Sequence, residues 1–194
     1  MIDINDLRIK INRDYKSKVK RFEKMYKTKS LIAGDSMVAY FMKYSSWSLQ
    51  GIPGDTTEGL LNRINLIQKL NPKIVIIHIG FNDFIFIDEK KRSTVSNLKK
   101  ISEKLVGIKV YICTPIPIVE SRIGDLKKII SNEKLSILRK EILDNFDPVD
   151  IIDLYPNFLQ KDIENKNLYN EDGIHLNKNG YQIYKKIMEL FYED

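Results

Sequence analysis

From residue 30 onward, short runs of β-branched and other apolar residues alternate with longer stretches in which apolar residues recur every three to four positions. Short apolar runs are typical of strands buried on both faces, and the longer stretches are typical of helices that pack on a sheet. We therefore predict strands at Leu31–Ala33, Trp47–Leu49, Ile74–Ile79, Val110–Thr114 and Ile151–Leu154. Helices are predicted at Met37–Tyr44, Thr56–Leu70, Ser93–Leu105, Asp125–Asn145 and Lys178–Phe191.

This order of elements predicts an α/β fold with a parallel sheet between two layers of helices. The chain has 194 residues, which is the size of one domain, so we expect a single domain over residues 1–194. Crossovers between parallel strands are right-handed, and a closed barrel would need eight repeats, so a doubly wound three-layer sandwich is favoured. In such open sheets ligands bind beyond the carboxyl ends of the strands. Candidate functional residues should therefore follow strands directly.

The net positive charge of the chain arises from its first 29 residues. The whole chain has 32 Lys and Arg against 26 Asp and Glu, and residues 1–29 hold ten of the former and four of the latter. Apolar residues in this segment recur at helical spacing, which predicts a helix packed on the domain with a solvated basic face. A surface for anionic lipid, polymer or nucleic acid is the alternative. No nucleic-acid-binding motif supports it, so no nucleic acid partner is expected.

The cellular compartment is suggested by what the sequence lacks. Cys113 is the only cysteine, so no internal disulfide can form, which is typical of a reducing compartment. The N-terminus has neither the apolar core nor the cleavage site of a secretory signal. No apolar run approaches the ~18 residues of a membrane-spanning helix. We expect a cytoplasmic protein without a transmembrane segment.

Four polar motifs fall after predicted strands or just before the last predicted helix. They are Gly34-Asp35-Ser36, Gly51-Ile52-Pro53-Gly54-Asp55-Thr56, Gly80-Phe81-Asn82-Asp83 and Asp172-Gly173-Ile174-His175. A hydroxyl, an imidazole, a carboxylate and amide donors are the groups that acyl transfer requires. The four motifs together therefore indicate a serine hydrolase.

Ser36 is the candidate nucleophile. Gly34 allows a sharp turn at the end of the first strand, which places Ser36 at the start of a helix, where N–H groups and the helix dipole stabilise negative charge. A strand followed by Gly-Asp-Ser and a helix is also a common plain N-cap. Taken alone, this motif does not distinguish the two.

The chain has two histidines, and their surroundings differ. His78 lies within an apolar strand, Ile-Val-Ile-Ile-His-Ile, where a hydrogen-bonded core imidazole is expected. His175 lies in a polar loop three residues after Asp172, a spacing that lets the carboxylate hold Nδ1–H and leaves Nε2 free to accept the Ser36 proton. Asp-x-x-His could also be a turn or a pair of metal ligands, but no further His or Cys cluster completes a metal site.

A serine nucleophile needs donors aimed at the developing oxyanion. The backbone N–H of Gly54, the side-chain amide of Asn82 and the N–H of Ser36 could supply three. Gly54 could instead be a turn glycine, and Asn82-Asp83 a cap or turn.

The four motifs, in this order and at these distances, resemble the four sequence blocks of the SGNH hydrolases, also called the GDSL esterase/lipase family, over residues 31 to about 190. The resemblance implies a flavodoxin-like α/β/α sandwich of five parallel strands, no metal or organic cofactor, and hydrolysis of carboxylic esters. It also implies Ser36 as nucleophile, Asp172 and His175 as the rest of a catalytic triad, and Ser36, Gly54 and Asn82 as oxyanion donors. Gln50 stands where members often have Asn, which puts a supporting hydrogen bond in doubt.

Six aromatic residues near the proposed site suggest a substrate pocket, although core packing is an equal use for such side chains. They are Phe41, Tyr44, Trp47, Phe81, Phe84 and Phe86. We predict that Asp35, Trp47, Phe81 and Phe84 line the pocket. Because 194 residues leave little room for a lid, short acyl groups are favoured, such as acetyl esters on a carbohydrate, with a lysophospholipid or short-chain ester as the other choice.

Two other readings of the same sequence remain. The fold could persist as a non-catalytic ligand-binding module, although all the catalytic residue types are present. It could instead be a flavodoxin or a phospho-receiver with Asp35 or Asp83 as its acidic site. The receiver reading gives His175 and Gly54 no role.

Overall fold

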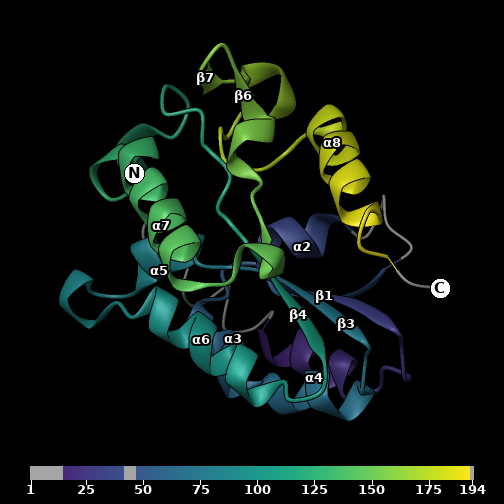
Figure 1. Ribbon diagram of the computed structural model, residues 1–194. Helices are drawn as coiled ribbons and strands as arrows, with labels where there is room; N and C mark the ends of the chain where they lie inside the picture. Colours follow the sequence, from purple (N-terminus) through teal and green to yellow (C-terminus); the bar gives the residue numbers. More distant parts are fainter. Residues whose placement is uncertain (1–14, 42–46, 193–194) are drawn as a thin grey trace.

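The computed structural model describes residues 15–41 and 47–192 and has a central parallel sheet (Figure 1). Its strand order is β2-β1-β3-β4-β5, the flavodoxin-like order, which confirms the predicted fold class. All four neighbouring pairs are parallel. The strands are β1 (Ser30–Gly34), β2 (Ser48–Gly51), β3 (Ile74–His78), β4 (Lys109–Cys113) and β5 (Ile151–Ile152).

Helices cover both faces of this sheet (Figure 1). They are α2 (Ser36–Phe41), α3 (Thr57–Asn62), α4 (Ile64–Leu70), α5 (Phe81–Phe86), α6 (Thr94–Lys104), α7 (Asn132–Asn145) and α8 (Lys178–Glu189). Apolar residues of α3, α4, α6 and α7 form one core cluster, and those of α2 and α8 form a second on the opposite face. The result is the three-layer sandwich that the sequence predicts.

Alternation along the strands divides the side chains between these two cores. On β1, Leu31 packs with the first cluster and Ile32 with the second; on β3, Val75 and Ile76 do the same. Successive strand side chains point to opposite faces, and here both faces are covered, so these strands contain no polar residue until their ends. His78, at the last position of β3, is the polar residue at the end of that strand.

Two long predicted helices are shorter or interrupted in the structure. The predicted helix Thr56–Leu70 is wrong as a continuous element, because the chain leaves helical geometry at Arg63 between α3 and α4. The Arg63 side chain turns inward to hydrogen-bond carbonyl oxygens of the sheet end. The predicted helix Asp125–Asn145 begins only at Asn132, where the Ser131 side chain accepts from the Lys134 N–H and caps α7.

Helix α5 and a small hairpin are among the elements that were not predicted. Helix α5 begins at Phe81, soon after the end of β3, in the motif where we predicted an oxyanion donor or, as the alternative, a cap or turn, but no helix. A hairpin of β6 (Leu159–Gln160) and β7 (Ile163–Glu164) lies before α8 in the chain. Its turn residues, Lys161 and Asp162, have φ of 52° and 62°, a left-handed conformation that usually requires glycine or asparagine, so the sequence carries little sign of the turn.

The predicted N-terminal helix is described only in part. Residues 15–22 are helical, and Phe22 is 3% exposed in a small cluster with Ile52 and Leu66. Residues 1–14 lie outside the described part, as does Tyr44 at the end of the predicted helix Met37–Tyr44. Within residues 15–41 and 47–192, no helix is long and apolar enough to cross a membrane.

Candidate active site

The register of the sheet brings the first three polar motifs to the same edge. Gly34 at the end of β1 pairs with Gly51 of β2 on one side and with His78 of β3 on the other. A Cβ atom on Gly34 would lie 2.0 Å from the His78 carbonyl oxygen, so the close approach of β1 and β3 requires glycine here. The segments that carry Ser36, Gly54 and Asn82 therefore leave adjacent strands at one end of the sheet.

Ser36, His175 and Asp172 form a continuous hydrogen-bonded chain. His175 Nε2 lies 2.9 Å from Ser36 Oγ, and His175 Nδ1 lies 2.7 Å from Asp172 Oδ2. A carboxylate on Nδ1 fixes the imidazole tautomer and directs the Nε2 lone pair at the serine hydroxyl. The structure thus brings the three predicted triad residues into the geometry that general-base activation of a serine requires.

The loop that carries His175 also fixes Asp172. Its Oδ1 accepts from the backbone N–H groups of Ile174 and His175, both at 2.9 Å, while its other oxygen faces the imidazole. Burial alone would raise the pKa of Asp172, but the hydrogen bonds from His175 and Ile174 outweigh it and lower this pKa to about 2. The carboxylate is therefore ionised at neutral pH.

Two of the three predicted oxyanion donors are available in the structure. Neither the Ser36 N–H nor the Gly54 N–H has an acceptor among the residues that the structure describes. Gly54 has φ of 77°, a left-handed conformation suited to glycine, which sets the direction of its N–H. Unpaired N–H groups beside a nucleophile are what an oxyanion would use.

The third predicted donor, Asn82, is already engaged. Its Nδ2 donates to Asp35 Oδ2 at 3.2 Å and to the Asp55 carbonyl at 3.1 Å. The Asn82 amide nitrogen thus links Asp35, which precedes Ser36, to Asp55, which follows Gly54. The three motifs are tied together, and the Asn82 amide is held from two sides.

Asp35 and Asp55 are buried acids in this network. Burial raises the pKa of Asp35 to about 7, although a hydrogen bond from the Met37 N–H opposes the rise. Burial also raises the pKa of Asp55 to about 6, against the pull of the Arg63 guanidinium. Arg63 Nε donates to Asp55 Oδ2 at 2.9 Å, with the two side chains 3% and 1% exposed.

The Gln50 side chain, near the end of β2, forms hydrogen bonds that support the loop following this strand. It is fully buried, its Oε1 accepts from Arg63 Nη1 at 3.3 Å, and its Nε2 donates to the Leu66 carbonyl at 3.4 Å. The departure from the usual asparagine therefore leaves a hydrogen-bonded side chain in place.

Asp83 supports the site without reaching it. Its carboxylate accepts from the backbone N–H and the hydroxyl of Thr57 and from the hydroxyl of Thr94, and it is fully buried. These bonds fix the start of α3, and with it the loop of Gly54, to the start of α6.

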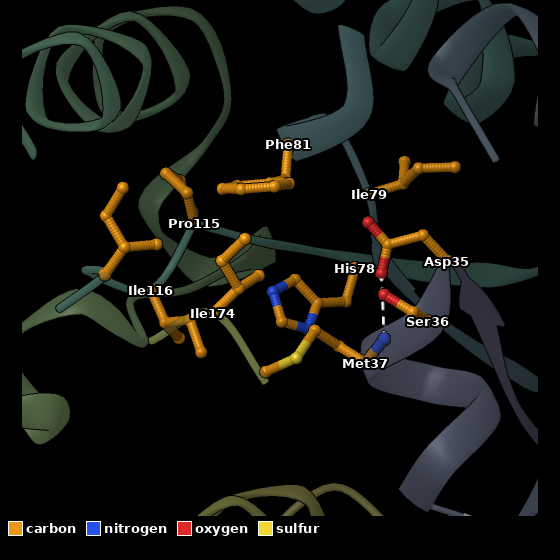
Figure 2. Close-up of a pocket in the computed structure, with 10 residues that line it drawn as sticks. Asp35, Ser36, Met37, His78, Ile79, Phe81, Pro115, Ile116 and Ile174 are labelled. Carbon is orange, nitrogen blue, oxygen red and sulfur yellow. Dashed lines mark hydrogen bonds between the residues drawn. The ribbon is translucent and has the colours of Figure 1, made fainter. Parts of the chain in front are cut away.

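A pocket opens beside Ser36 (Figure 2). Its empty volume is about 430 Å³, part of it open to solvent, and most of its walls are apolar. Its lining residues are Asp35, Ser36, Met37, His78, Ile79, Phe81, Pro115, Ile116, Ile118 and Ile174. Such a pocket suits a small, mainly apolar group held against the serine.

Of the four residues predicted to line the substrate pocket, the structure places two there. Asp35 and Phe81 line it; Trp47 and Phe84 do not. Trp47 is 5% exposed and packs in the core cluster of α2 and α8, with its ring against Tyr192. Phe84 lies under the Arg92 guanidinium and lines a separate hollow between α5, α6 and α7. The predictions for Trp47 and Phe84 conflict with this geometry because each ring packs away from Ser36.

Sequence reasoning missed one side chain that contacts the triad. The Tyr40 ring packs edge-on against His175, with centroids 5.1 Å apart. Tyr40 follows Ser36 by four residues, so both lie on one face of α2. The four-residue spacing within a predicted helix is the sequence signal that could have placed Tyr40 beside the triad.

His78 is buried and hydrogen-bonded as predicted, but it also lines the pocket. Its Nδ1 lies 3.0 Å from the Tyr184 hydroxyl, and burial lowers its pKa to about 4. In the described part of the chain, no cluster of three or more His, Cys, Asp or Glu side chains is arranged to hold a metal ion.

Comparisons with known proteins agree with the fold. A protein from Streptococcus pneumoniae, provisionally named a platelet activating factor, aligns with a TM-score of 0.80 and 18% identity over 97% of both chains. An acetyl xylan esterase aligns with a TM-score of 0.59 and 20% identity over 84% of this chain and 99% of that one.

The alignment with a curated sequence relative covers a smaller part of both proteins than these structural alignments do. An N-acylneuraminate cytidylyltransferase of Escherichia coli O18:K1:H7 is 35% identical over 116 residues, which are 57% of this chain. The match spans only 26% of that relative.

The family model of the GDSL-like lipase/acylhydrolase family matches residues 32–183, a span that contains all four polar motifs. This match covers well over half of the chain and includes the sheet edge on which Ser36 lies. The chain therefore belongs to the GDSL-like lipase/acylhydrolase family.

Proposed function

We propose that this hydrolase is a serine esterase that removes short acyl groups, acetyl in particular, from a carbohydrate. The observation that carries the proposal is the hydrogen-bonded chain from Ser36 Oγ through the His175 ring to Asp172. The identity of the substrate rests on the pocket and the relatives.

The reaction proceeds through an acyl-enzyme. His175 Nε2 takes the Ser36 proton as Oγ attacks the ester carbonyl, and the imidazolium then gives that proton to the departing alcohol. Water, deprotonated by the same nitrogen, attacks the acyl-enzyme and releases the acid. The ionised Asp172 stabilises the imidazolium in both steps.

The oxyanion of each tetrahedral intermediate receives hydrogen bonds from the free Ser36 and Gly54 N–H groups. Asn82 supplies the third by sharing the hydrogen that it donates to Asp35, a bond already long at 3.2 Å. Because the amide is held at two points, little reorganisation is needed when charge develops.

The pocket and the relatives support a small acyl group on a sugar. The pocket beside Ser36 is mainly apolar and narrow, which fits a short acyl chain. One structural neighbour is an acetyl xylan esterase, and others are family 3 carbohydrate esterases. The curated relative is named for an N-acylneuraminate, so O-acetylated N-acylneuraminate belongs among the substrates to be tested.

Labelling with a fluorophosphonate tests the mechanism. An activated Oγ displaces fluoride and forms a covalent phosphonate, so intact-protein mass spectrometry should show one adduct, mapped to Ser36. Ser36→Ala should abolish the adduct and lower kcat by about a millionfold, whereas Ser121→Ala, at an exposed serine, should change neither. A crevice that only binds a ligand would leave Ser36 unlabelled.

A substrate panel then tests the assignment. It combines p-nitrophenyl esters of increasing chain length with acetylated xylan oligosaccharides, O-acetylated N-acylneuraminate and a lysophospholipid. We expect the highest kcat/KM on acetylated sugars and a fall with acyl length. Faster turnover of long chains or of the lysophospholipid would contradict the proposed substrate but not the proposed mechanism.

A further inference from the structure

The pocket beside Ser36 contains one polar side chain that the proposed mechanism does not use. Apart from Asp35 and Ser36, its walls are apolar except for His78 (Figure 2). Figure 2 shows the His78 ring standing in the pocket between Met37 and Ile174. A neutral imidazole in an otherwise apolar wall offers the substrate a single polar contact.

The hydrogen bond between His78 and Tyr184 decides whether the His78 ring donates or accepts in the pocket. Tyr184 is fully buried, and among residues 15–41 and 47–192 its hydroxyl has one hydrogen-bond partner, His78 Nδ1 at 3.0 Å. If Nδ1 carried the ring proton, the hydroxyl hydrogen of Tyr184 would be left unpaired in the core, which is costly. The hydroxyl must therefore donate to Nδ1, and the ring proton lies on Nε2.

The remaining nitrogen is free to meet a ligand. Within the described residues His78 Nε2 has no hydrogen-bond partner, and it is not among the fully buried polar atoms that lack one. The Nε2–H therefore faces the pocket as a donor. The ring stays neutral at working pH because burial lowers the pKa of His78 to about 4.

We propose that His78 is a specificity-determining residue whose Nε2–H donates to an acceptor oxygen on the part of the ester that fills this pocket. The proposal rests on the proposed serine esterase function and narrows its substrates to esters with an ether, hydroxyl or carbonyl oxygen near the scissile bond. Sugar esters meet this condition on the alcohol side, and oxygenated acids meet it on the acyl side. Tyr184 sets the tautomer that makes the contact favourable.

Two matched ester pairs test the proposal. On the acyl side they are p-nitrophenyl methoxyacetate and p-nitrophenyl butanoate; on the alcohol side they are 2-methoxyethyl acetate and butyl acetate. In each pair an oxygen replaces a methylene group. For each pair the ratio of kcat/KM is measured in wild type and in His78→Leu, so that differences in intrinsic reactivity cancel.

We expect His78→Leu to lower the ratio by about 10- to 100-fold in one pair, which identifies the half of the substrate that meets His78. His78→Gln, which keeps an N–H donor, should restore much of the ratio. Tyr111→Phe, at a tyrosine remote from the pocket, should leave it unchanged. An unchanged ratio in both pairs for His78→Leu would overturn the proposal.

Nitrogen NMR of the unliganded protein provides a readout that does not depend on activity. The ¹⁵N shifts of the His78 ring should show a neutral imidazole protonated at Nε2 with a hydrogen-bonded Nδ1, and Tyr184→Phe should shift the Nδ1 resonance to that of an acceptor without a partner. A ring protonated at Nδ1 in wild type would refute the assignment even if the enzyme hydrolyses esters. The expected tautomer with no labelling of Ser36 would instead refute the proposed function.

Discussion

Asp35 and Asn82 hydrogen-bond through Oδ2 and Nδ2 at 3.2 Å, which joins the residue before the candidate nucleophile to a candidate oxyanion donor. Asp35 directly follows β1, and Asn82 is the second residue of α5, which follows the adjacent strand β3; both residues are buried. The Asp35 carboxylate thus sets the orientation of the amide that the proposed mechanism uses, while its other oxygen accepts from the Met37 N–H at the start of α2.

Asn82→Ala should lower kcat by about 10²–10³ with little change in KM, because the lost donor acts on charge that develops only in the transition state. Steady-state kinetics on p-nitrophenyl acetate measure this. Asn97→Ala, which removes an amide bonded to Thr57 rather than to Asp35, serves as the matched control and should retain most activity. A pure rise in KM for Asn82→Ala would refute the oxyanion role.

Asp35→Asn should change how stability depends on pH. Burial raises the pKa of Asp35 from 3.8 to about 7, so between these values the folded state holds a proton that the unfolded state has lost. Wild-type stability from this group is therefore full below pH 4 and is lost as pH rises through 7. Asparagine does not titrate, so the free energy of unfolding of wild type minus that of Asp35→Asn should fall over this range. Urea denaturation at pH 4.5, 6 and 8 measures it, and a constant difference would show that Asp35 is not so shifted.

Asp172→Asn should lower kcat by about 10³–10⁴ while the protein stays folded, since an amide can no longer stabilise the imidazolium or fix its tautomer. Activity is measured at several pH values above 4, where the low pKa of Asp172 keeps the wild-type carboxylate ionised. Asp125→Asn, at an exposed acid paired with Lys128, is the control. Near-native turnover of Asp172→Asn would mean that His175 acts without this partner.

Arg63→Met should reduce the free energy of unfolding by about 3–5 kcal/mol at pH 8, because it leaves the buried Asp55 carboxylate without its cation. Chemical denaturation monitored by circular dichroism measures the change. Lys128→Met breaks an exposed pair with Asp125 and should cost less than about 1 kcal/mol. Equal effects of the two substitutions would contradict the buried role of Arg63.

Most of the sheet could be predicted from the sequence, because β1 and β3 are buried along their whole length, β4 is buried at its end, and apolar runs mark these segments. The break at Arg63 could not, since local helical spacing continues through it and the cause is a distant hydrogen bond to the Gly34 carbonyl. Helix α5 is only six residues long and begins at Phe81 inside a motif that also fits a turn.

The candidate site divides in the same way. Ser36, Asp172 and His175 could be selected by residue type and spacing, and the structure brings them together. The lining of the pocket could not be predicted from the sequence. Trp47, Phe84 and Phe81 are all large aromatic residues near the motifs, and only the path of the backbone decides that Phe81 lines the pocket and the other two do not. The role of Tyr184 beside His78 depends on a contact between residues 106 positions apart, which no local pattern reveals.

The candidate base, His175, lies far from Ser36 in the sequence. His175 contacts Ser36 across 139 positions and lies two residues before Asn177, the N-cap of α8. A nascent or truncated polypeptide therefore carries the serine without the group that would make it reactive. Under the proposed mechanism, esterase activity therefore requires that the segments carrying Ser36 and His175 are both synthesised and folded against each other.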